Sequence, residues 1–182
     1  MTSGGTGGAD PNAPVWRPDA PAAPHQEVWY LKLNGGDGRA LWLRFTLLVN
    51  GDATRRIAET WAIAFEKQAS GAVWKAAAKQ TAPLDAFHLH AAAPARFAIG
   101  ENTFSSGSTR GRVRSDDHDI RWELEMAPAA PLAFDFVPAP LQRAGLVKNL
   151  AATPFEDLRF SGWTEVDGAR WTWSDAPGMR GQ

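Results

Sequence analysis

The most regular pattern of apolar and polar positions lies between Glu27 and Lys67. Three apolar runs, Glu27–Leu33, Ala40–Asn50 and Ile57–Lys67, are separated by segments rich in Gly, Asp and Asn. The runs are rich in Trp, Phe, Val, Ile and Thr, which favour strands, whereas the residues between them favour turns. The pattern predicts an antiparallel sheet around which the rest of the chain is organised.

Several strands carry large apolar or aromatic residues on both faces, for example Trp29 beside Tyr30 and Trp42 beside Leu43. In the second run, one face holds Leu41, Leu43, Phe45, Leu47 and Val49, and the other holds Trp42, Arg44, Thr46 and Leu48. In the third run, Glu59, Trp61, Ile63 and Phe65 share a face, opposite Thr60, Ala62, Ala64 and Glu66. Strands that are apolar on both faces favour a barrel with a lined interior and a partly covered exterior. The pattern leaves open which face points inward.

Further short runs continue the same alternation to the end of the chain. We expect strands at Val73–Gln80, Asp85–His90, Ala95–Phe104, Gly107–Arg114, Ile120–Met126, Leu132–Val137, Asp157–Val166 and Ala169–Ser174. Leu141–Leu150 is the one segment expected to form a helix, and Asp167-Gly168 is a strong hairpin signal. About nine to eleven strands with at most one or two short helices predict an all-β fold, an antiparallel meander closed as a barrel rather than a sandwich.

The first 24 residues differ in composition from the remainder. Residues 1–24 are rich in Pro, Gly and Ala and predict a flexible tail, so the barrel domain is expected at 25–182. Trp16 is the exception in this tail and is expected to pack on the domain. No secretory signal and no apolar window of membrane-spanning length is present, so a cytoplasmic protein is expected.

Composition excludes several classes of function. A net charge of −1 and a pI near 6.4 lack the basic excess of nucleic-acid-binding proteins. The absence of Cys excludes disulfides and thiol chemistry. Nine Trp against one Tyr is an unusual ratio, and Trp generally fills a core or lines a pocket.

Four short segments resemble a known family. They are E-x-W-Y-L-K at Glu27–Lys32, A-L-W-L-R-F-T at Ala40–Thr46, E-T-W at Glu59–Trp61 and R-F-S-G at Arg159–Gly162. This wording is similar to the N-terminal half of a lipocalin-like (calycin) superfamily that includes AttH-type proteins, carotenoid hydratases (hydroxyneurosporene synthases) and tocopherol cyclases. The resemblance implies a calycin-type barrel, the first of two, and long apolar or polyene substrates that are hydrated or cyclised.

The resemblance also implies only half of such a molecule. Family members usually continue from a P-G-M-x-G-like segment into a second barrel, whereas here Pro177–Gln182 ends the sequence. We therefore expect a homodimer or a second-barrel partner as one way to complete the protein.

Three residues are candidates for catalysis. Glu27 and Glu59 are the carboxylates nearest the Trp-rich strands, and a partly buried carboxyl group could protonate an alkene. Tyr30, the single Tyr, could donate a proton or a hydrogen bond. The competing interpretation makes both Glu side chains ordinary sheet charges, paired with Lys32 or Arg44, and Tyr30 an ordinary sheet residue.

Five residues are candidates for binding an apolar ligand. They are Trp29, Trp42, Arg44, Trp61 and Trp122. Indole faces could line a polyene pocket and stabilise a developing carbocation. The competing interpretation makes the Trp residues part of the core.

Other clusters point to weaker sites. His88 and His90 share a strand face, but no third ligand stands at motif spacing, so no metal is expected. Arg110, Arg112 and Arg114 share a face that could hold an anionic headgroup or simply be solvated. The Gly-rich turn at 35–38 lacks the helix that follows a phosphate loop, and no cofactor is expected.

Three functions are consistent with the sequence. The first is binding of a long apolar small molecule, an isoprenoid or lipid, in the barrel. The second is a hydratase or cyclase with Glu27 or Glu59 as the acid. The third is a non-catalytic half-barrel that works only with a partner chain.

Overall fold

The computed structural model of the chain describes residues 13–16, 24–90, 96–128, 134–135, 152–153 and 155–182. The strands are β1 (His25–Asn34), β2 (Arg39–Val49), β3 (Arg56–Lys67), β4 (Val73–Pro83), β5 (Phe87–Leu89), β6 (Phe97–Ile99), β7 (Asn102–Phe104), β8 (Ser108–Arg114), β9 (Asp119–Pro128), β10 (Phe134–Asp135), β11 (Ala152–Thr153), β12 (Phe155–Val166) and β13 (Ala169–Gly181). A single 3₁₀ turn, η1 (Leu84–Ala86), joins β4 to β5 in this part of the chain.

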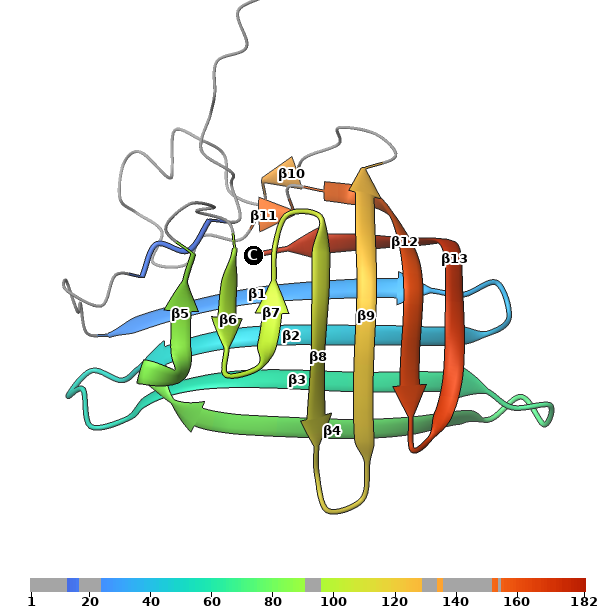
Figure 1. The fold of residues 1–182 in the computed structure, drawn as a ribbon, viewed down its shortest axis with the longest axis horizontal. Coiled ribbons are helices and arrows are strands. Elements are labelled where there is room, and N and C mark those ends of the chain that lie inside the picture. The colour runs from blue at the N-terminus through green and yellow to red at the C-terminus, as the bar shows by residue number, and fades with distance from the viewer. Residues whose placement is uncertain (1–12, 17–23, 91–95, 129–133, 136–151, 154) are drawn as a thin grey trace, which may run out of the picture.

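Eleven of the described strands form one antiparallel sheet in the order β4-β3-β2-β1-β13-β12-β9-β8-β7-β6-β5, and β10 pairs with β11. The sheet curls into two layers that cross steeply, with β1–β4 in one layer and β5–β9 in the other (Figure 1). The edges of the sheet are β4 and β5, which follow each other in sequence, so the barrel is open along that seam. The expected all-β, lipocalin-like antiparallel barrel is confirmed.

Most expected strands are present, but some begin, end or are interrupted at positions that the apolar pattern did not predict. The run Ala95–Phe104 is divided by Gly100, at φ +56°, into β6 and β7. Asp85 and Ala86 belong to η1 rather than to a strand. β13 continues past Ser174 to Gly181 despite Pro177, and only Phe134–Asp135 of the expected edge strand 132–137 is a strand among the described residues. The expected helix at 141–150 and most of the expected tail lie outside the described residues.

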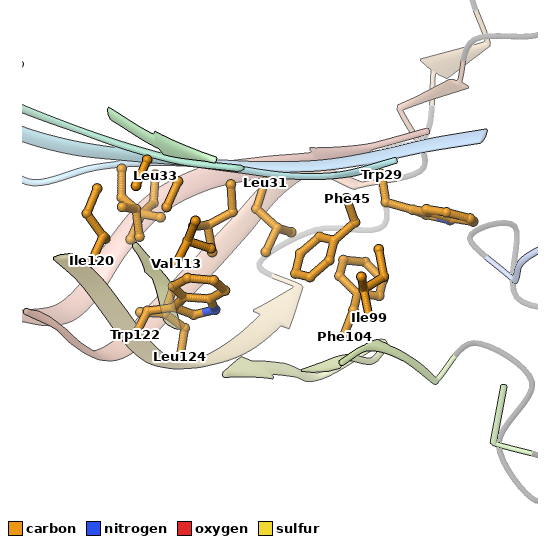
Figure 2. Close-up of a cluster of buried hydrophobic side chains, with 14 of the residues drawn as sticks. Trp29, Leu31, Leu33, Phe45, Ile99, Phe104, Val113, Ile120, Trp122 and Leu124 are labelled. Atoms are coloured by element: carbon orange, nitrogen blue, oxygen red, sulfur yellow. The ribbon is translucent and has the colours of Figure 1, made fainter. Parts of the chain in front are cut away.

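The core fills the space between the two layers (Figure 2). Trp29, Leu31, Leu33 and Phe45 reach down from β1 and β2, and Ile99, Phe104, Val113, Ile120, Trp122 and Leu124 reach up from β6–β9 (Figure 2). Aromatic rings meet at the centre, with Phe97 4.6 Å from Trp29 and 4.9 Å from Phe104 between centroids. The interior is therefore packed with the protein's own side chains.

The layer β3–β4 points its small residues inward. Ala58, Ala62, Ala64, Ala76 and Ala78 are all buried, whereas Trp61 and its neighbours of the same parity lie on the outer face. Large side chains from the opposite layer already fill the interior, so only small ones fit against them. The apolar residues of β3 that do not fit inside are left outside.

Gly162 lies in β12 at a position where no side chain fits. The pairing of β12 with β13 shifts register between Phe160 and Gly162, which is a bulge. Gly162 has φ +129°, and a Cβ there would lie 2.2 Å from the carbonyl oxygen of Glu123. The backbone conformation and the close approach of β9 therefore require glycine at this position.

Trp16 packs on the domain, as expected. Its side chain is buried, and its ring lies 5.1 Å from the His25 ring and within 5.7 Å of the Arg56 guanidinium. The segment 13–16 thus lies against the end of the barrel where β1 and β3 begin.

Candidate functional site

Five of the residues singled out from the sequence come together on the outside of the barrel. Tyr30, Trp42, Arg44, Glu59 and Trp61 lie on the outer side of β1, β2 and β3, which together with the outer side of β4 we call the outer β1–β4 face. The strand register aligns Tyr30 with Arg44 and Arg44 with Trp61, and continues from Trp61 to Lys79 on β4. This row crosses all four strands because directly opposed residues in a sheet share a face.

Trp61 is the centre of this row. The Arg44 guanidinium lies 5.9 Å from the ring centroid on one side, and the Lys79 ammonium lies 5.0 Å from it on the other. Both distances are within the range of cation–π attraction. The indole N–H donates to the Glu59 carboxylate at 3.2 Å. Trp61 is thereby fixed in one orientation, with a half-buried aromatic surface facing outward.

Glu59 is ionised in this setting. Burial alone would raise its pKa, but hydrogen bonds from the Thr81 hydroxyl and the Trp61 indole, together with the Lys79 ammonium, outweigh burial and hold the pKa of Glu59 below its usual value. The Thr81 hydroxyl lies 3.0 Å from Oε1, and Lys79 Nζ lies 3.5 Å from the same oxygen. A carboxylate held in this way is a poor proton donor, which weighs against Glu59 as the acid; that role stays a prediction.

Arg44 has a different kind of environment. The side chain is half-buried, its Nε atom is buried without a hydrogen bond, and no carboxylate of the described residues lies within ion-pair distance of it. The hydroxyl of Thr46, two residues along the same face, is also buried without a partner among the described residues. Buried polar groups of this kind are usually satisfied, so this part of the face has unused hydrogen-bonding capacity.

The apolar part of the face surrounds this row, and the lysines lie at its border. Half-buried side chains on the face include Val28, Trp42, Ile57, Ile63 and Phe65. Lys32, Lys75 and Lys79 are exposed around them. An apolar centre with a charged rim is the usual arrangement of a protein interface.

Glu27 lies elsewhere, on the inward side of β1 at the end of the barrel. Its carboxylate accepts the backbone N–H groups of Val15 at 2.8 Å and Trp16 at 2.6 Å. His25 Nε2 lies 2.6 Å from it, and the amide of Gln182 donates to it at 3.5 Å. Glu27 thus holds the segment 13–16 against the end of the barrel. Its expected role as an acid stays a prediction.

Trp29 and Trp122 are core residues, with side chains 0% and 1% exposed. Trp29 packs against Phe97, and the indole N–H of Trp122 donates to the Thr109 hydroxyl at 3.0 Å. Of the two interpretations offered by the sequence, core filling describes these two Trp residues. Trp42 and Trp61 differ because their strand faces point away from the interior.

The other clusters are largely committed to local contacts. Arg112 and Arg114 both contact Asp119. Among the residues that the structure describes, no group of three or more His, Cys, Asp or Glu has the geometry to hold a metal ion, and this includes His88 and His90.

None of the helices in the described ranges is long and apolar enough to cross a membrane.

Lys79 and Thr81 are neighbours of Glu59 and Trp61 that were not predicted from the sequence. The signal was available in the turn at Ser70-Gly71, which pairs β3 with β4 so that Glu59 faces Thr81 and Trp61 faces Lys79. Counting register outward from that turn would have placed both residues.

Known proteins resemble the chain in structure rather than in sequence. No model of a protein family matches the chain, and no curated protein matches it. A solved structure from Nitrosomonas europaea, described as an AttH protein, superposes with a TM-score of 0.52 at 14% sequence identity, over 86% of this chain and 49% of that one. The chain therefore spans about half the length of that protein. The similarity supports the AttH-like calycin fold expected from the sequence.

Proposed function

We propose that the chain is a non-catalytic half-barrel that works by assembling with a second copy of itself through the outer β1–β4 face. The observation that carries this proposal is the orientation of β3, which holds alanines inward and Trp61, Ile63 and Phe65 outward. Apolar and aromatic side chains that gather on one outer face, around an Arg without an acid partner among the described residues, resemble the energetic centre of an interface.

The charges on this face favour a second copy as the partner. Arg44 forms no ion pair with a described residue, and Glu59 lies one strand across and one row along on the same face. A two-fold axis between these residues would set Arg44 of each copy against Glu59 of the other, because a two-fold interface contacts itself reciprocally. A half-buried guanidinium paired with a carboxylate is a strong, geometrically specific contact.

The size of the face and of the similar structure support the same partner. Four strands of about ten residues present roughly 600 Å² per copy, so two copies would bury about 1,200 Å² in all, near the lower limit of specific interfaces. The similar solved structure has about twice the matched length, and a second copy would supply a comparable amount of chain. We expect a reversible dimer with a dissociation constant in the micromolar range.

The test is sedimentation equilibrium from micromolar to millimolar protein. We expect dimer formation that is weakened at least about tenfold by Trp61→Ser and that is unchanged in Trp163→Ser, an outer-face Trp on β12. A wild-type chain that stays monomeric over this range would overturn the proposal.

A charge exchange tests the geometry. Arg44→Glu and Glu59→Arg should each abolish self-association, because each places like charges against one another. When the two variants are mixed, both cross-copy pairs again join opposite charges, so a mixed dimer should form. Failure of the mixture to associate, with both variants folded by circular dichroism, would exclude the proposed pairing.

Binding of a long apolar molecule is the second candidate, and the shared outer position of Tyr30, Trp42 and Trp61 favours it. An isoprenoid or lipid-like chain could lie along this face in place of a second copy. Titration of Trp fluorescence with fatty acids, retinoids and linear isoprenoids should then show saturable quenching that Trp61→Ser reduces. Turnover of a bound polyene, lost in Glu59→Gln, would establish the hydratase or cyclase alternative.

A further inference from the structure

A hollow lies at the end of the barrel where the segment 13–16 packs. It has a volume of about 500 Å³ and lies between Trp16, the start of β3, the turn η1 and β5. Small-molecule sites in proteins typically enclose about 300–1,000 Å³. It adjoins the outer β1–β4 face at Pro83, and the residues that carry the dimer proposal, Arg44, Glu59 and Trp61, are not part of its lining.

Part of the wall of this hollow is apolar. Trp16, Leu84 and Phe87 line it, and these side chains are only 3%, 7% and 5% exposed. Trp16 is fixed by the hydrogen bonds that its own N–H and the N–H of Val15 donate to Glu27. A pre-formed aromatic wall holds an apolar group without the entropy cost of ordering the site.

Two opposite charges line the same hollow without pairing. Arg56 and Asp85 both contribute to its lining, and they form no ion pair with each other or with another described residue. The Arg56 guanidinium carbon lies 5.7 Å from the Trp16 ring, which keeps the cation beside the aromatic wall. His88 also lines the hollow.

We propose that the barrel-end hollow binds the zwitterion of an apolar α-amino acid. The carboxylate would pair with Arg56, the ammonium with Asp85, and the side chain would lie between Trp16 and Phe87. A simple apolar acid would leave Asp85 facing its carboxylate, and a simple amine would leave Arg56 facing its ammonium. A ligand with both charges avoids each repulsion, and this difference sets the specificity.

The probes for the test are L-phenylalanine, 3-phenylpropionate and 2-phenylethylamine, which share the phenyl group and differ in charge. Binding is followed by the ¹H–¹⁵N resonance of the Trp16 indole, assigned by its loss in Trp16→Phe. We expect saturable shifts with L-phenylalanine and affinities about five- to tenfold weaker for the two singly charged compounds.

Two variants with matched controls separate the charges. Arg56→Gln should weaken L-phenylalanine and 3-phenylpropionate but not 2-phenylethylamine, and Asp85→Asn should weaken L-phenylalanine and 2-phenylethylamine but not 3-phenylpropionate. Arg55→Gln and Asp116→Asn, exposed residues outside the lining, should change nothing. No saturable shift at millimolar L-phenylalanine, or equal affinity for all three probes, would overturn the proposal.

Discussion

The indole of Trp61 donates its N–H to Glu59, two residues earlier on the same strand, across 3.2 Å. Side chains two apart on a strand share a face, so a single strand can carry both partners. Lys79 completes the arrangement, since its ammonium contacts both the Trp61 ring and the Glu59 carboxylate. The position of Trp61 at the centre of the outer face therefore depends on the ionised carboxylate of Glu59.

The pH dependence of stability should report this carboxylate. Its pKa is lower in the folded chain than the ordinary value of 4.5, so its contribution to stability is complete above pH 4.5 and is lost as pH falls through the folded pKa. Glu59→Gln should therefore lower the free energy of unfolding by about 1–2 kcal/mol at pH 7 and by much less near pH 3. Urea unfolding at both pH values measures the difference. An equal loss at both would mean that the ionised form is not the stabilising one.

Two buried threonines should respond in opposite directions to the same substitution. Thr60 is fully buried and its hydroxyl has no partner among the described residues, whereas the Thr164 hydroxyl accepts the Trp173 indole N–H at 2.8 Å. Thr60→Val should stabilise the protein by about 0.5–1 kcal/mol, and Thr164→Val should destabilise it by about 1–3 kcal/mol. Midpoints of chemical unfolding compare them, and destabilisation by Thr60→Val would show that its hydroxyl is satisfied.

Gly162→Ala should be strongly destabilising. A Cβ at this position meets the carbonyl of Glu123 at 2.2 Å, and the φ of +129° disfavours any L side chain. The expected loss is at least about 2 kcal/mol in the free energy of unfolding. Gly51→Ala is the control, since a Cβ there meets nothing within 4 Å, and its effect should stay within about 0.5 kcal/mol. Similar effects of the two substitutions would argue against the bulge.

The hydrogen bonds from the segment 13–16 to Glu27 should be measurable by hydrogen exchange. In Glu27→Ala, the amides of Val15 and Trp16 lose their acceptor, so both should exchange at least about tenfold faster. The amide of Leu31, within the ladder between β1 and β2, is the internal control and should be unaffected. Unchanged protection of Trp16 would indicate that the segment 13–16 is held by its buried ring alone.

The alternation of residue types predicted the strands and their faces well, because a period of two is a local property. It separated the residues of β2 into the two sets that the structure places inside, with Leu41, and outside, with Trp42, but it did not say which set is inside. The prediction joined β6 and β7 into one strand. The turn between them depends on the positive φ angle of Gly100, which the pattern of apolar residues does not reveal.

The direction of each face could not be read where both faces are apolar. On β3 the larger residues, including Trp61, point out, because the inside is already filled from the other layer, and that competition is not local. The grouping of Tyr30, Arg44 and Trp61 was similarly out of reach, since it depends on the register of three strands. Glu27 illustrates the reverse case, in which a residue chosen for its charge serves the chain's own N-terminal segment.

The position of β1 beside β13 has a consequence for synthesis of the chain. In the main sheet of the described residues, every other pair of neighbouring strands lies within β1–β4 or within β5–β13. The pairing of Tyr30–Leu33 with Gly178–Gly181 joins these two groups across most of the sequence. The strands β1–β4 can assemble as they leave the ribosome, and β5–β13 can follow as a second unit. The two units can join only when Gly178–Gly181 emerge, because these residues carry the pairing with β1, and closing so long a loop is slow. A nascent chain halted before Gly178 would therefore carry two unjoined sheets with their apolar inner faces open to chaperones.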